Sequence, residues 1–174
     1  MGRPMALNLH RAGFGVRVYD VSPQALAAAA QAGLATAGTP VAAIQDAEVI
    51  ILMLPSDEAL CGLMEGEGGL LGHLQAGQIV IDMATSLLTT SQRLAAQAAD
   101  RGATLMDAPV SGGSEGAQAG TLSSMVGGEA ASVERCRPVL SAMGSTLTHI
   151  GGQGMVLIAK YVNQMVMEAS FCAV

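Results

Sequence analysis

The stretch Glu48-Val-Ile-Ile-Leu-Met-Leu54 is apolar at nearly every position and ends at Pro55. A strand with one face in water would carry polar residues at every second position, so this run predicts a strand buried on both faces. Two further apolar runs, residues 78–83 and 103–108, lie on either side of a helical pattern over residues 89–100. Strands that alternate with helices predict an α/β fold with a mostly parallel sheet.

Helix-start signals lie around these strands. Ser22-Pro23 and Thr39-Pro40 each place a capping hydroxyl before a proline, the residue that suits the first helical position. Upstream, we expect a helix over residues 1–11 and a short strand over residues 16–20. Downstream, we expect strands at residues 122–126 and 146–150, a helix at 130–143 and a long helix from residue 155. The alternation predicts a doubly wound sheet with helices on both faces.

Length, composition and charge limit the classes of function. The 174 residues suffice for one hydrophobic core, and 51% hydrophobic with 13% charged residues suits a globular α/β domain. The net charge of −6 argues against nucleic acid as a partner, because phosphate binding needs a basic face. No run of about 18 apolar residues is present, so a membrane span is not expected.

Residues that commonly bind metals or act as nucleophiles give no pattern of that kind. The three cysteines are far apart and lack CxxC spacing, which indicates a reducing, cytoplasmic location: Cys61, Cys136 and Cys172. The three histidines show no ligand spacing, so no metal site is predicted: His10, His73 and His149. Four hydroxyls are interpreted as helix-start polar groups: Ser86, Thr89, Thr90 and Ser91.

Gly2 begins the first expected helix, and Asp20 ends the first expected strand. In dinucleotide-binding βαβ units a glycine lets helix and strand pack closely, and an acidic residue about 20 positions on accepts hydrogen bonds from ribose hydroxyls. Gly2 and Asp20 have this spacing. An ordinary helix start and an ordinary strand-end carboxylate would produce it too, so the spacing alone leaves both interpretations open.

Longer motifs favour the cofactor interpretation. Met1-Gly-Arg-Pro-Met-Ala-Leu-Asn-Leu9, followed by Ala12-Gly-Phe-Gly-Val-Arg-Val-Tyr-Asp20, resembles the opening of the β-hydroxyacid dehydrogenase family, G-[LF]-G-x-M-G-x-x-M-A-x-N-L. This family includes 3-hydroxyisobutyrate dehydrogenase and tartronate semialdehyde reductase. The resemblance covers essentially the whole chain and implies a Rossmann-type domain. The chain opens on a helix, so we expect it to lack the first strand of that domain.

The resemblance also implies a cofactor site. The positions that match the family's cofactor segments are Met1, Gly2, Asp20, the loop Met53-Leu54-Pro55, and Thr85 of Asp82-Met-Ala-Thr85. Ala84 stands where the family usually has serine. An Asp at position 20 repels the 2′-phosphate of NADP, and Val21 offers no cation to bind it, so NAD is expected rather than NADP.

Asp107-Ala-Pro-Val-Ser-Gly-Gly113 is the most specific segment of the sequence. It presents a hydroxyl and bare backbone N–H groups at the carboxyl edge of the sheet, and such groups suit a carboxylate. A glycine-rich turn without a ligand is the alternative for Ser-Gly-Gly alone. The whole segment resembles the family's substrate loop, which implies that Ser111, Gly112 and Gly113 bind the substrate.

Lys160 is the single lysine of the chain, and it shares a helix face with Asn163 and Gln164 at i, i+3 and i+4. A solvated surface lysine is the usual alternative, but this helix is otherwise apolar. The resemblance implies that Lys160 is the general acid/base and that the two amides orient the substrate. Beside a nicotinamide in a closing cleft, its pKa is expected to be lowered. Val156 replaces a glycine of the family pattern, which leaves the substrate's identity open.

The implied activity is NAD-dependent, reversible oxidation of a short 3-hydroxyacid to its semialdehyde, in an enzyme that is a homo-oligomer when full length. A 6-phosphogluconate dehydrogenase-like enzyme and a non-catalytic dehydrogenase-fold binding module are the alternatives; Lys160 and the acidic charge count against the module. Residues 1–152 are expected to form the dinucleotide-binding domain, and 153–174 the start of a helix leading to an all-α domain. The chain is expected to be truncated at both ends and inactive alone.

Overall fold

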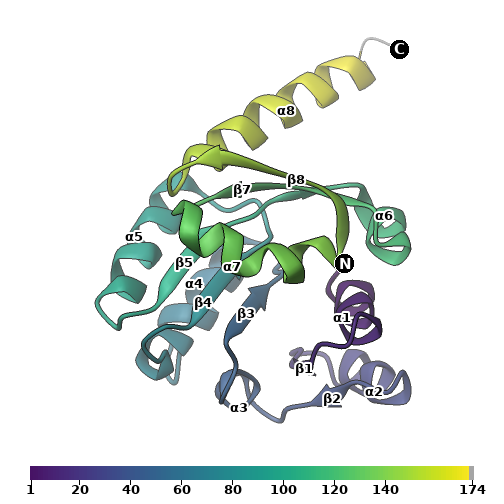
Figure 1. The fold of residues 1–174 in the computed structure, drawn as a ribbon, viewed down its shortest axis with the longest axis vertical. Helices are drawn as coiled ribbons and strands as arrows, with labels where there is room; N and C mark the ends of the chain where they lie inside the picture. Colours follow the sequence, from purple (N-terminus) through teal and green to yellow (C-terminus); the bar gives the residue numbers. More distant parts are fainter. Residues whose placement is uncertain (173–174) are drawn as a thin grey trace.

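A computed structural model describes residues 1–172 of the chain. Three parallel strands form one side of the main sheet (Figure 1): β3 (Val49–Leu52), β4 (Ile79–Asp82) and β5 (Thr104–Asp107). They coincide with the three apolar runs of the sequence, and every residue of β4 is buried. The prediction of a mostly parallel sheet is confirmed. The prediction that β3 is buried on both faces is wrong, because β3 is an edge strand of the described sheet and its Val49 and Ile51 are only half-buried.

The other side of the sheet is antiparallel, which the sequence patterns did not predict. β7 (Leu122–Gly127) runs antiparallel to β5 and to β6 (Val110–Ser111), and β8 (Gly144–Gly151) pairs in parallel with β7. Residues between β6 and β7 form one short helix, α6 (Gly113–Ala119). A parallel connection needs a crossover of roughly a dozen residues or more. The shorter segment therefore returns the chain beside β6 in the opposite direction.

β1 (Arg17–Val18) and β2 (Ala35–Thr36) form a parallel pair outside the main sheet. The strand expected over residues 16–20 is therefore shorter than predicted. The helix between them, α2 (Pro23–Gln31), begins as predicted, because Ser22 Oγ accepts a hydrogen bond from the backbone N–H of Ala25 at 3.3 Å. The same type of cap opens the next helix, α3 (Pro40–Ile44).

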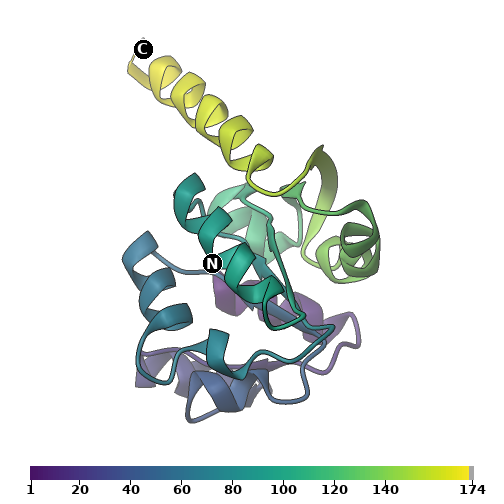
Figure 2. The same ribbon diagram turned by 90° about the vertical axis from the view of Figure 1, so that its left-hand side faces the viewer.

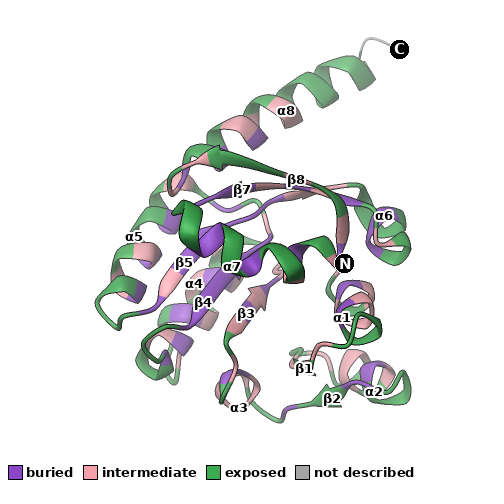
Figure 3. Ribbon diagram, viewed as in Figure 1, coloured by how far each residue is buried: buried purple, intermediate pink, exposed green. Residues whose placement is uncertain are grey.

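Helices cover both faces of the main sheet (Figures 1 and 2). On one face lie α1 (Gly2–Arg11), α6 and α7 (Ala130–Ser141); on the other lie α3, α4 (Asp57–Glu65), the 3₁₀ turn η1 (Leu70–His73) and α5 (Leu88–Ala99). Successive strand side chains point to opposite faces, so Ile79 and Ile81 pack in the first layer and Val80 in the second. Buried residues concentrate between these layers (Figure 3), as a doubly wound fold requires.

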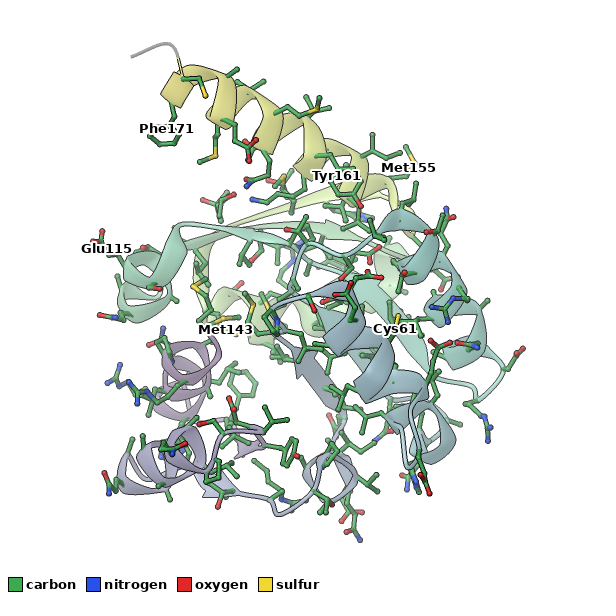
Figure 4. The ribbon with its side chains drawn as sticks, turned by 180° about the vertical axis from the view of Figure 1, so that it is seen from behind. Cys61, Glu115, Met143, Met155, Tyr161 and Phe171 are labelled. Carbon is green, nitrogen blue, oxygen red and sulfur yellow. The ribbon has the colours of Figure 1, made fainter. Side chains whose placement is uncertain are left out.

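The last helix, α8 (Met155–Cys172), projects away from the rest of the domain (Figures 1 and 2). Its buried residues lie in its first two turns: Val156, Leu157 and Lys160. Farther along, its large apolar side chains are exposed, and Phe171 lies near its far end (Figure 4). Within residues 1–172, no helix combines the length and hydropathy that crossing a membrane would require.

Asn8 ties α1 to α6, and we expect Asn8→Ala to lower the free energy of unfolding by about 1 kcal/mol. Asn8 Nδ2 donates to the carbonyl oxygen of Ala117 at 2.7 Å, and that bond has the net value typical of protein hydrogen bonds. The corresponding fall in Tm is roughly 2–4 °C for a chain of this size. Thermal and urea unfolding would measure it, with His10→Ala on the exposed side of α1 as the control. An equal effect of the two substitutions would show that the bond does not stabilise the domain.

Candidate active site

Lys160 lies at the carboxyl edge of the sheet, on the second turn of α8. Its Nζ donates to Ser111 Oγ at 2.8 Å and to the carbonyl oxygen of Val110 at 3.1 Å. The residue is only 4% exposed, and this burial lowers the pKa of Lys160, since removal from water disfavours the ammonium. The fold thus brings together two predicted site residues that are 49 positions apart in the sequence.

The Ser-Gly-Gly segment lies where β6 ends and α6 begins. Gly112 and Gly113 have φ values of +126° and +60°, a region that side chains disfavour. A Cβ at Gly112 would also come within 3.3 Å of Leu122 Cδ2. Both glycines are exposed, so their backbone is accessible next to the Ser111 hydroxyl. The segment expected to bind the substrate therefore also opens a short helix, which the sequence patterns did not predict.

Asn163 and Gln164 follow Lys160 on α8 and are half-buried. Asn163 Nδ2 donates to Gln164 Oε1 at 3.4 Å and lies 3.7 Å from the sulfur of Met167. The two amides thus lie side by side, one turn beyond the lysine. Their expected contact with a substrate remains a prediction.

Val156, which departs from the family pattern, is fully buried between α8 and β7. A Cβ at Gly127 on β7 would lie 2.9 Å from Val156 Cγ1. The valine side chain thus occupies space that the strand leaves free by carrying a glycine. Val156 therefore packs against the sheet as part of the core.

Two of the segments expected to bind the cofactor, the start of α1 and the loop after β3, lie against each other. α1 begins at Gly2, and a Cβ there would lie 3.9 Å from Met53 Cβ, so the helix start touches the loop after β3. Met1 and Leu54 are half-buried, and Pro55 and Thr85 are exposed. Asp20, just after β1, is also exposed and accepts a hydrogen bond from the backbone N–H of Ser22 at 2.9 Å.

These residues fit a dinucleotide. The first turn of α1 carries no acidic side chain, and a helix amino end attracts phosphate groups. The exposed Asp20 carboxylate can accept hydrogen bonds from a ribose. Arg17, the nearest cation on β1, donates to the carbonyl oxygens of Ala42 and Gln45 at 3.1 and 3.0 Å. Its guanidinium is thereby engaged at the end of α3, which disfavours a 2′-phosphate beside Asp20.

Three carboxylates near the site were not identified as functional from the sequence. Asp82 and Asp107, the last residues of β4 and β5, are buried, and burial raises the pKa of each. Each of the three accepts a hydrogen bond from a hydroxyl at or near the start of α5: Thr90 donates to Asp57, Ser86 to Asp82 and Ser91 to Asp107. Three hydroxyls interpreted as helix-start groups therefore donate hydrogen bonds to carboxylates. The sequence signal that could have identified Asp82 and Asp107 is their position at the end of a buried strand.

Tyr161 provides a further contact that the sequence analysis missed. Its hydroxyl donates to the backbone carbonyl oxygen of Ser86 at 2.5 Å. Figure 4 shows the residue at the root of α8. This bond joins the helix of Lys160 to the loop that holds Thr85.

A family model described as the NAD binding domain of 6-phosphogluconate dehydrogenase matches residues 1–151. The chain belongs to this family. The resemblance inferred from the motifs is thereby confirmed, because the family's curated members similar to this chain include hydroxyacid dehydrogenases.

Two curated proteins of Pseudomonas aeruginosa illustrate this similarity. The 3-hydroxyisobutyrate dehydrogenase is 42% identical and the NAD-dependent L-serine dehydrogenase 40% identical, each over 167 residues. In both cases the match covers 96% of this chain and 56% of the relative, so the chain spans just over half of their length. A solved structure, Psf3 in complex with NADP⁺ and 2-OPP, superposes with a TM-score of 0.91 at 30% identity. That match covers 95% of this chain and 59% of Psf3.

Proposed function

We propose that this chain is the NAD-binding part of an enzyme that oxidises a short 3-hydroxyacid to its semialdehyde, with Lys160 as general acid/base. The observation that carries the proposal is the buried contact of Lys160 Nζ with Ser111 Oγ at the carboxyl edge of the sheet. In this assignment residues 1–152 form the dinucleotide-binding domain, and residues 153–174 begin the helix that leads into an all-α domain.

The chain's own groups divide the work of binding and proton transfer. The Ser111 hydroxyl and the backbone N–H groups of Gly112 and Gly113 bind the substrate carboxylate. The neutral amine of Lys160 accepts the proton of the substrate hydroxyl, and Asn163 and Gln164 orient that hydroxyl. Burial of Lys160 lowers its pKa, which raises the fraction of neutral amine near neutral pH.

The cofactor assignment uses the residues around the start of α1. Those that would hold NAD are Met1, Gly2, Asp20, Met53, Leu54, Pro55 and Thr85. Bound NAD would supply the two-electron acceptor for the oxidation. Asp20 and the engaged Arg17 favour NAD over NADP, since no free cation of β1 stands beside the ribose position.

The named substrates of the relatives support a short 3-hydroxyacid. L-Serine and 3-hydroxyisobutyrate each have a carboxylate at C1 and a hydroxyl on C3. A cytoplasmic location and a homo-oligomeric state of the full-length enzyme stay predictions from the sequence.

Initial rates on a panel of acids test this function. We expect the product of the complete reading frame to reduce NAD with at least one of the 3-hydroxyacids 3-hydroxyisobutyrate, L-serine and glycerate. We also expect kcat/KM to be lower with 6-phosphogluconate, because the segment Asp107-Ala-Pro-Val-Ser-Gly-Gly113 resembles the substrate loop of dehydrogenases that act on short hydroxyacids. A preference for 6-phosphogluconate would show instead that the enzyme is 6-phosphogluconate dehydrogenase-like. NAD binding without turnover of any acid would favour a non-catalytic module.

A further inference from the structure

Asp107 is fully buried at the end of β5 and accepts three hydrogen bonds. Ser91 donates its hydroxyl to Oδ1. Gln153 Nε2 and the backbone N–H of Gly154 donate to Oδ2 at 2.8 and 2.9 Å. A carboxylate buried without hydrogen-bond partners is costly in free energy. The arrangement in which all three donors reach Asp107 is therefore favoured over others.

Two of these donors belong to the segment from which α8 starts. Gly154 directly precedes the helix and has a φ of +82°. A Cβ added at Gly154 would lie only 2.5 Å from Leu88 Cδ1. The connection is therefore tightly packed. Lys160 lies less than two helical turns farther on, and its Nζ reaches back to Ser111, four residues after Asp107 on the same side of the sheet.

We propose that Asp107 is a positioning residue: by holding Gln153 and Gly154 against the end of β5, it fixes the root of α8 and sets Lys160 beside Ser111. The inference rests on the proposed function for its kinetic consequence. Asp107 itself lies beneath the site and acts through the helix. The Tyr161 bond to Ser86 restrains the next part of the same helix.

The donor pattern distinguishes two substitutions at this position. In Asp107→Asn, the amide oxygen can still accept from Gln153 and Gly154, while the amide nitrogen faces the Ser91 hydroxyl, which can accept. In Asp107→Ala, the backbone N–H of Gly154 loses its acceptor, and Gln153 Nε2 keeps only the hydroxyl oxygen of Ser91, at 2.8 Å. Both substitutions remove the negative charge. A difference between them therefore reports the hydrogen bonds and not the charge.

The state of Lys160 can be measured directly, because the chain contains one lysine. Lysine labelled with ¹³C at Cε gives a single side-chain resonance, whose pH titration yields the pKa of Lys160. Ionisable groups on the elements around the root of α8 are Asp57, Asp82, Asp107, His149 and Tyr161. Burial lowers the pKa of Lys160, so displacement of the helix into water should raise that pKa.

We expect the titration midpoint of Asp107→Asn to stay close to that of the wild type. In Asp107→Ala it should rise measurably toward the value of free lysine, about 10.4. Equal midpoints in folded Ala and Asn variants would overturn the proposal. Should Asp107→Ala fail to fold, Gln153→Ala provides the test. This substitution removes one donor to Asp107 at a half-buried position, and an unchanged titration midpoint in that variant would overturn the proposal.

Kinetics of the complete gene product give the second readout. We expect kcat per folded active site to fall about 10²-fold in Asp107→Ala, the scale of a catalytic group displaced by about 1 Å. Asp107→Asn should recover most of this loss, and KM for NAD should change little in either variant. A purely structural role would lower Tm but leave the lysine pKa and kcat per folded site unchanged. Absence of turnover in the wild type would refute the proposed function, while the lysine titration would still test the positioning.

Discussion

Replacement of Lys160 by methionine is expected to lower kcat for 3-hydroxyacid oxidation by about 10²–10⁴-fold, the range for loss of a general acid/base. Methionine keeps an unbranched apolar stem in the buried site but has no amine to accept the hydroxyl proton. NAD binding should persist, because the residues that we propose hold the cofactor lie outside α8. Steady-state rates by NADH absorbance and calorimetric titration of NAD would measure the two effects.

Lys160→Arg separates proton transfer from charge. Arginine keeps the cation but stays protonated in proteins and cannot accept a proton, so the same large loss is expected. Recovery of more than about a tenth of kcat by arginine would show that the residue acts through its charge, against a role in proton transfer.

The pH profile of the wild type provides a further check on this residue. Oxidation requires the neutral amine, so kcat/KM should rise with pH through the pKa of Lys160 and then level off. Because burial lowers that pKa, this rise should lie below the value of about 10.4 for free lysine. The rise should be absent from the Lys160→Met profile.

The double substitution Asp20→Ser with Val21→Arg is expected to shift the ratio of Kd values about 10²-fold toward NADP. Removal of the carboxylate ends its repulsion of a 2′-phosphate, and an arginine at position 21 adds a charge-assisted hydrogen bond worth about 1.5–3 kcal/mol. Val21 is 87% exposed, so the longer side chain meets no packing constraint. Calorimetric titration of both cofactors would measure the ratio.

Arg17→Ala is the matched control for this experiment. The Arg17 guanidinium is held by two carbonyl oxygens at the end of α3, so its loss should leave the NAD to NADP ratio unchanged even if stability falls. A ratio that moves with Arg17 and not with positions 20 and 21 would place the specificity determinant on β1.

Local chemistry explains which parts of the fold could be predicted. β3, β4 and β5 follow from apolar runs, and the starts of α2 and α3 follow from hydroxyl caps before prolines. The antiparallel position of β7 could not be predicted, because pairing with β5 and β6 depends on distant partners and not on local pattern. For the same reason β1 proved shorter than its sequence pattern indicated.

The site shows the same division. The assignment of Lys160 and Ser111 to one site followed from the family resemblance, since no spacing rule joins residues so far apart. The hydrogen bond between them was not predicted. The bonds of Ser86, Thr90 and Ser91 to carboxylates were missed, because a hydroxyl near a helix start has an equally good local explanation. Which partner such a hydroxyl takes depends on how α5 packs over the strand ends.

The antiparallel return of the chain at β6 and β7 has a consequence for ligand affinity. The Ser111 strand is paired along its length with β7, and α6 follows it without an intervening loop. The backbone that we propose binds the substrate carboxylate is therefore ordered during folding, before any ligand arrives. Binding of an acid loses little conformational entropy in this segment, so selectivity among acids of similar size should arise from enthalpic contacts with their side chains.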